Sequence, residues 1–97
     1  MDLTQLNTKQ LYINGEWRES KGGSLHPVIN PATEETLCEV IQGTLDDVDD
    51  AVAAAKAAFK EWRHSRAAKR QALMHAIADG MEARKQDLID AVSQALG

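Results

Sequence analysis

The sequence of 97 residues predicts two β-hairpins followed by two to three α-helices, in a chain long enough for one small domain. Two turn signals, Asn14-Gly15 and Asn30-Pro31, each separate a pair of short apolar runs. From Thr44 onward, apolar residues instead recur every three or four positions, as on one face of an α-helix. The expected parts are a flexible arm over residues 1–9, a β-hairpin ribbon over 10–43 and a helical part over 44–97.

The first hairpin is expected around Asn14-Gly15. Residues 11–13 (Leu-Tyr-Ile) favour a strand, and Trp17 resumes one on the other side of the turn. Asn and Gly both tolerate positive φ, which the two central residues of a type I′ turn require. This dipeptide is the strongest short-range hairpin signal in the chain.

The second hairpin is expected to join a strand over residues 24–29 to a strand over 37–41. Pro27 has no N–H to donate, so the first of these strands is expected at a sheet edge. Residues 30–33 (Asn-Pro-Ala-Thr) make a good turn, because proline presets φ at the second position and Asn favours the first.

The first helix is expected to begin after Thr44, a good N-cap, with Asp47 completing a variant capping box. Four aspartates in its first two turns suit the positive end of the helix dipole. Small residues at positions 51, 54 and 58 widen the apolar face of this helix and would let a partner backbone approach closely. One face carries the larger apolar stripe: Val48, Val52, Ala55, Phe59 and Trp62.

A second helix is expected after Ser65, which is a plausible N-cap. Its apolar stripe fades over residues 84–87 and then restarts, so we predict a kink or a helix–helix boundary there. Gly97 suits a C′ position. The stripe before the break comprises Leu73, Ala76, Ile77, Gly80 and Met81, and the stripe after it Leu88, Ile89, Val92 and Leu96.

The composition narrows the class of protein. With 43% hydrophobic and 27% charged residues, the chain is expected to be neither disordered nor membrane-spanning, and no apolar run approaches the roughly 18 residues of a membrane helix. The net charge of -4 gives no bulk attraction to nucleic acid or anionic lipid. Because the single cysteine excludes an internal disulfide and no secretory signal is visible, a cytoplasmic location is expected.

No catalytic or cofactor-binding residue can be assigned. Cys38 has no basic neighbour to activate it, and a plain strand cysteine is the better interpretation. The histidines, His26, His64 and His75, lack metal-ligand spacing. The basic segment 56–70 is better explained as a solvated face than as a nucleic-acid surface, because aromatic residues for stacking are sparse.

Glycines do not supply a phosphate-binding loop either. Such a loop needs glycines between a strand and a helix N-terminus, and Gly22-Gly23 does not have that context. Gly43 does precede a predicted helix, but four aspartates follow it and would repel a phosphate.

The order of motifs resembles the N-terminal segment of the NAD(P)-dependent aldehyde dehydrogenase superfamily over residues 10–97. The stretch LYINGEW resembles the first hairpin of that family, and VINPATEETLCEVIQGTLDDVDDAVAAAKAAF resembles its second hairpin and first helix. RAAKRQALMHAIADGMEARKQDLIDAVSQALG is similar to the next helices. The resemblance implies an α/β parent fold, aldehyde dehydrogenase-like, with a Rossmann-type cofactor domain.

The resemblance also implies a parent enzyme that oxidises an aldehyde to a carboxylic acid with NAD or NADP, through a cysteine thiohemiacetal. The nucleophile, the base and the nucleotide-binding core of the family map to no residue of this chain, and Cys38 does not occupy the position of the nucleophile. The segment would pack against the remainder of the parent polypeptide, in a homodimer or homotetramer, and would be inactive alone.

A metal site is the one site that the resemblance implies within the chain. In many members of the family, a monovalent cation is bound by the backbone carbonyls of the two residues before the Asn-Pro turn, which here are Val28 and Ile29. Hard cations prefer oxygen ligands, so the chemistry is reasonable. The alternative, that both carbonyls pair with the neighbouring strand or with water, stays open.

Two other classes of function stay open beside the structural segment of an enzyme. One is a stand-alone α+β protein-interaction module, which would need a stable monomeric fold. The other is a nucleic-acid-binding domain using the basic segment, which would need salt-sensitive binding to DNA or RNA.

Overall fold

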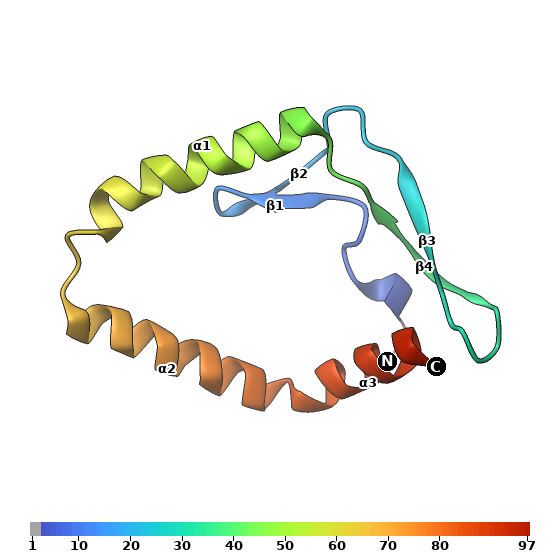
Figure 1. Cartoon of the computed structure of the whole chain (residues 1–97). Coiled ribbons are helices and arrows are strands. Elements are labelled where there is room, and N and C mark those ends of the chain that lie inside the picture. The colour runs from blue at the N-terminus through green and yellow to red at the C-terminus, as the bar shows by residue number, and fades with distance from the viewer. Residues whose placement is uncertain (1–2) are drawn as a thin grey trace.

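The computed structural model describes residues 3–97 as an open frame built from two short hairpins and three helices (Figure 1). This architecture confirms the predicted order of two hairpins followed by helices. In chain order, the elements are the 3₁₀ turn η1 (Leu3–Gln5), β1 (Leu11–Ile13), β2 (Glu16–Arg18), β3 (Leu25–Ile29), β4 (Thr36–Ile41), α1 (Leu45–Trp62), α2 (Ala67–Ala83) and α3 (Lys85–Leu96).

The first hairpin pairs β1 with β2 in antiparallel register, with Ile13 opposite Glu16. Asn14 and Gly15 both have positive φ, 56° and 77°, so the predicted type I′ turn is confirmed. Tyr12 and Trp17 lie directly opposite each other, and their rings meet edge to face with centroids 5.1 Å apart.

The second hairpin pairs β3 with β4 as a separate two-stranded sheet, so the predicted edge position of Pro27 is confirmed. The Asn30 side chain closes the turn, because its Oδ1 accepts the Ala32 N–H at 2.9 Å. The Asn30 N–H also donates to the Glu35 carbonyl at 2.9 Å. As a result β4 begins at Thr36, one residue earlier than expected.

Helix α1 has the predicted capping box, in which the Thr44 hydroxyl accepts the Asp47 N–H and the Asp47 carboxylate accepts the Thr44 N–H. Its alanine side faces the first hairpin, where Ala51, Ala54 and Ala58 border a cavity of about 370 Å³ together with Tyr12. The larger apolar stripe of α1 lies beside this contact, and Val48 borders a cavity with Tyr12 and Ile13 of the first hairpin. The exposed members of the stripe are Val48, Val52, Phe59 and Trp62.

The boundary between α2 and α3 lies at Arg84, which confirms the break predicted over residues 84–87. The prediction that Ser65 caps α2 is wrong. The N-cap is Arg66, which makes no side-chain hydrogen bond, whereas the Ser65 hydroxyl donates to the Trp62 carbonyl at 2.6 Å. The Ser65 hydroxyl is therefore bonded to the last turn of α1 and is not available to cap α2.

The frame encloses very little core of its own. Among the described residues, the buried apolar side chains are those of Leu3 and Ile13. The radius of gyration is 16.7 Å, whereas a compact chain of this length has about 12.5 Å. The apolar faces of the helices are consequently open, and we expect other protein to cover them.

The frame is closed at its ends. Helix α3 returns to the second hairpin (Figure 1), and Gly97 lies against the Asn-Pro turn, where an added Cβ would be 2.9 Å from Pro31 Cγ. The first described residues also lie there. Leu3 is buried and Thr8 hydrogen-bonds to β4, a contact that the prediction of a loose arm over residues 1–9 did not include. The flexibility of that arm stays a prediction.

Candidate functional site

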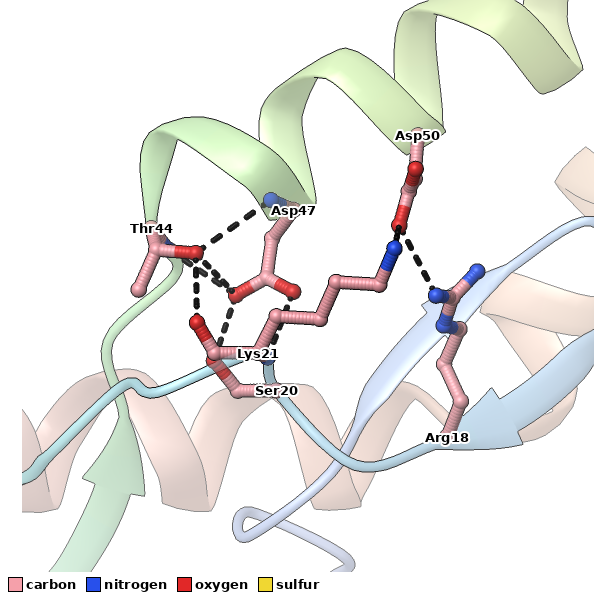
Figure 2. Close-up of polar contacts among 6 residues, drawn as sticks. All are labelled: Arg18, Ser20, Lys21, Thr44, Asp47 and Asp50. Carbon is pink, nitrogen blue, oxygen red and sulfur yellow. Dashed lines mark hydrogen bonds and ion pairs between the residues drawn. The ribbon is translucent and has the colours of Figure 1, made fainter.

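The densest group of polar contacts joins the loop after β2 to the first turns of α1 (Figure 2). We call it the hairpin–helix cluster. It brings together residues from two segments that are more than twenty positions apart in sequence. Its members are Arg18, Ser20, Lys21, Thr44, Asp47 and Asp50.

Asp47 is the centre of this cluster, with a residue exposure of 2%. Its carboxylate accepts the Lys21 N–H at 2.8 Å and the Thr44 N–H at 2.9 Å. It also accepts a hydrogen bond from the Ser20 hydroxyl. The Thr44 hydroxyl lies 3.0 Å from the Lys21 carbonyl, to which it can donate. Asp47 thus caps its own helix and fixes the loop at the same time.

A second carboxylate adds a charge contact one turn further along α1. Asp50 Oδ2 lies 2.7 Å from Lys21 Nζ and 2.9 Å from the Arg18 guanidinium (Figure 2). The Asp50 side chain is 29% exposed, so solvent only partly screens these pairs. The strand β2 is therefore tied to the same helix as the loop that follows it.

Both carboxyl groups are held ionised by their surroundings. The hydrogen bond from the Ser20 hydroxyl, followed by those from the backbone N–H groups of Lys21 and Thr44, lowers the pKa of Asp47 far below its ordinary value of 3.8. The hydrogen bond from Lys21, assisted by the charges of Lys21 and Arg18, lowers the pKa of Asp50. The cluster therefore favours the folded state only while these groups are charged.

The cluster has the chemistry of a structural joint. Its carboxylates are acceptors whose donors are already supplied by the chain, and ionised carboxylates with such low pKa values are poor bases at neutral pH. A dinucleotide does not fit here either. Asp47 occupies the helix N-terminus that would otherwise bind a phosphate, and Gly22-Gly23 lies between β2 and β3, not before a helix.

An Asp47→Asn substitution is expected to destabilise the start of α1 and the loop after β2. Asp46→Asn is the matched control, because Asp46 lies in the same turn, is exposed and removes the same charge. Urea or thermal unfolding at pH 7 should show a larger loss of stability for Asp47→Asn. Equal losses for the two variants would contradict a special role for Asp47.

The difference between these variants should depend on acid. Because the folded state lowers the pKa of Asp47, the stabilisation is fully present above the ordinary pKa of 3.8 and is lost as the pH falls below it. Unfolding measured from pH 7 down to pH 2 should therefore show the two variants converging at the acid end. A gap that persists unchanged at low pH would mean that charge is not the cause.

Cys38 lies half-buried on β4, opposite Val28, and is a free thiol. It borders a cavity of about 260 Å³ together with Thr4, Thr8 and Lys9. No histidine borders that cavity, and the three histidines lie on β3, after α1 and on α2. Within residues 3–97, no group of three or more His, Cys, Asp or Glu side chains is placed to hold a metal ion.

The basic segment 56–70 forms the corner between α1 and α2. Some of its basic side chains make contacts within this corner. The Arg70 guanidinium donates to the Ser65 carbonyl, and Arg63 Nε lies 3.2 Å from His64 Nε2.

Val28 and Ile29, the predicted cation ligands, lie at the end of β3 where the register with β4 shifts. The Gln42 N–H donates to the Ser24 carbonyl, and the Asn30 N–H donates to the Glu35 carbonyl. Ser24 and Asn30 flank β3, and backbone groups alternate in direction along a strand, so the even-numbered residues of β3 direct their backbone groups toward β4. By the same alternation, the Ile29 carbonyl faces the open edge, and the Val28 carbonyl faces β4.

The sequence anticipated Thr44 and Asp47 as a cap but did not reveal the roles of Ser20, Lys21, Arg18 and Asp50. A signal was nonetheless present. Asp47 and Asp50 are one turn apart, and a polar Ser-Lys pair in a glycine-containing loop could supply donors to such a pair of carboxylates.

No helix within residues 3–97 combines the length and the apolarity that are needed to cross a lipid bilayer.

Known proteins similar to this chain are aldehyde dehydrogenases by name. A provisionally named aldehyde dehydrogenase of Staphylococcus aureus (strain bovine RF122 / ET3-1) is 49% identical over 90 residues, which is 93% of this chain and 19% of that protein. A similarly named protein of Staphylococcus haemolyticus is 44% identical over 91 residues, again 19% of its length.

Solved structures agree with this similarity. An aldehyde dehydrogenase from Bartonella henselae superposes with a TM-score of 0.88 at 32% identity, over 92% of this chain and 19% of that one. A NAD-dependent benzaldehyde dehydrogenase from Corynebacterium glutamicum superposes with a TM-score of 0.80 at 28% identity, over 91% of this chain and 19% of that one. The chain thus spans about a fifth of the length of the relatives it matches.

The sequence profile of the aldehyde dehydrogenase family matches residues 17–97. This range includes the second hairpin, the hairpin–helix cluster and all three helices. The predicted resemblance is therefore confirmed, and the chain belongs to the aldehyde dehydrogenase family.

Proposed function

We propose that the chain is the N-terminal structural segment of an enzyme that oxidises an aldehyde to a carboxylic acid with NAD or NADP, through a cysteine thiohemiacetal. The observation that carries this proposal is the family match over residues 17–97, together with the TM-score of 0.88 to an aldehyde dehydrogenase. The described residues contribute positioning contacts and no group suited to the chemistry. Their task is to build a frame against which the rest of the polypeptide folds.

Exposed apolar faces support this structural task. Val52, Phe59 and Met81 are 59%, 57% and 57% exposed, although each belongs to a predicted apolar stripe. Soluble proteins rarely leave such contiguous apolar surface uncovered. Since the relatives are about five times longer, we propose that the remainder of the parent polypeptide covers these faces.

A stand-alone interaction module is less well supported. Such a module must fold by itself, yet among the described residues the buried apolar side chains are those of Leu3 and Ile13. A nucleic-acid-binding role also finds less support, because the basic corner uses Arg70 to close the turn between α1 and α2.

Further properties of the parent enzyme are proposed by family analogy. NAD is the named cofactor of the benzaldehyde dehydrogenase from Corynebacterium glutamicum, which supports NAD ahead of NADP here. We propose a homodimer or homotetramer in the cytoplasm, without nucleic-acid or membrane partners. The unpaired Cys38 suits a reducing compartment.

The proposed function is tested in the longer polypeptide that carries this segment. Aldehyde-dependent NADH or NADPH formation is expected, and Cys38→Ser should leave kcat within about twofold, because Cys38 is a strand residue and no histidine borders its cavity to act as its base. A polypeptide that never reduces NAD or NADP with any aldehyde would contradict the proposed enzyme. A drop of several orders of magnitude in Cys38→Ser would instead mean that Cys38 acts in the chemistry.

The cation site at Val28 and Ile29 remains part of the proposal. The Ile29 carbonyl faces the open edge of β3 and is available to an ion. The Val28 carbonyl faces β4, so it would have to bind the ion through the lone pair that strand pairing does not use. We therefore expect no tight cation in the chain alone and a bound one in the longer enzyme, where other residues complete the ligand set.

Crystals of that enzyme grown with rubidium would decide this point, because rubidium replaces potassium and scatters anomalously. An anomalous peak beside the carbonyls of residues 28 and 29 is expected. If both carbonyls bond only to backbone N–H groups and no peak lies beside them, the cation proposal is wrong.

A further inference from the structure

The N-terminal arm lies between two parts of the frame that are distant in sequence. Figure 1 shows η1 next to the second hairpin and close to the end of α3. On one side the arm contacts β4, and on the other Leu6 borders a cavity with the junction of α2 and α3, which we call the elbow.

The contact with β4 is made by one backbone and one side-chain hydrogen bond of Thr8. The Ile41 N–H donates to the Thr8 carbonyl at 2.8 Å, and the Thr8 hydroxyl donates to the Glu39 carbonyl at 2.6 Å. Residues 39 and 41 are the ones whose backbone groups point away from β3, so Thr8 pairs with the free edge of β4. Leu3, 7% exposed, anchors the start of the arm.

An apolar cavity lies between the arm and the elbow. Leu6 borders this cavity of about 400 Å³ together with Ile77, Gly80, Met81 and Leu88. Among the described residues, no atom beyond the local helix backbone lies within 4 Å of the position that a Cβ on Gly80 would take, so the Leu6 side chain faces the cavity without filling it. Leu6 is 40% exposed and Leu3 is 7% exposed, so Leu3 is the more tightly packed of the two.

We propose that residues 3–8 act as a strap that is bonded to the free edge of β4, closes one side of the elbow cavity and shields Cys38. The shielding follows from the cavity beside Cys38, which Thr4 and Thr8 of the strap border. Detaching the strap frees the edge of β4, opens the elbow cavity and exposes the thiol. The contact between Gly97 and Pro31 is a separate closure that the strap does not require.

Hydrogen exchange of single amides in the longer enzyme that carries this segment tests the strap directly. The Ile41 amide is bonded to the strap, whereas the neighbouring Gln42 amide donates to the Ser24 carbonyl at 2.9 Å and serves as an internal control. Starting the chain at residue 10 should speed exchange at Ile41 by roughly five- to tenfold, as expected for losing one or two hydrogen bonds, and leave Gln42 unchanged.

A pair of point variants covers the case in which the shortened chain unfolds. Leu6→Ser should speed exchange at Ile41, and Gln5→Ser, in the exposed part of η1, should not. Labelling of Cys38 by a thiol reagent should speed up in the same variants that release Ile41. If Ile41 exchanges at the unprotected rate in the full chain while Gln42 is protected, or if Leu6→Ser and Gln5→Ser behave alike in both assays, the strap is refuted.

Discussion

Replacing Phe59 with aspartate is expected to have opposite effects in the isolated chain and in the full-length enzyme. Phe59 is 57% exposed on the open apolar face of α1, and such surfaces drive association. The wild-type 97-residue chain should therefore self-associate or melt without a sharp transition, and Phe59→Asp should shift it toward monomer. Sedimentation velocity measures this shift.

In the longer enzyme the same substitution places a charge where the rest of the polypeptide is proposed to pack. Removing a buried Phe side chain typically costs about 3–5 kcal/mol, and an unpaired buried charge costs more. That is a large share of the roughly 5–15 kcal/mol by which proteins are stable, so most of the soluble, folded enzyme should be lost. Soluble yield and thermal unfolding measure this loss.

Ala53→Asp is the matched control for this pair of experiments. It introduces the same side chain, but Ala53 lies about 120° around the helix axis from Phe59, outside both the apolar stripe and the side facing the first hairpin. The Ala53→Asp substitution should cost only the helix-propensity difference between alanine and aspartate, about 0.7 kcal/mol. If Phe59→Asp behaves like Ala53→Asp in both settings, the open face is not a packing surface.

The elements that the sequence predicted well are those fixed by local chemistry. Asn14-Gly15 specifies its turn through positive φ at both positions, and Thr44 with Asp47 specifies a helix start through short-range hydrogen bonds. The break at Arg84 was visible because the apolar stripe loses its phase there. Each of these signals lies within a few residues.

The features that the sequence did not predict depend on distant partners. Ser65 looks like a cap for the next helix, but its hydroxyl is used by the Trp62 carbonyl. Lys21 and Asp50 pair because the loop after β2 folds back on α1. The small residues at positions 51, 54 and 58 were predicted to allow close approach of a backbone, but the sequence did not show that the first hairpin is the segment that approaches them.

The most direct test of the structural role is an activity assay of the purified 97-residue chain. With NAD or NADP and a panel of aliphatic and aromatic aldehydes, the chain should produce no NADH or NADPH above the blank. The physical reason is that among the described residues no histidine borders the Cys38 cavity, and the carboxylates of the hairpin–helix cluster already accept hydrogen bonds from donors of the chain. Reproducible aldehyde-dependent formation of NADH or NADPH, lost on Cys38→Ser, would contradict the account and make the chain itself a catalyst.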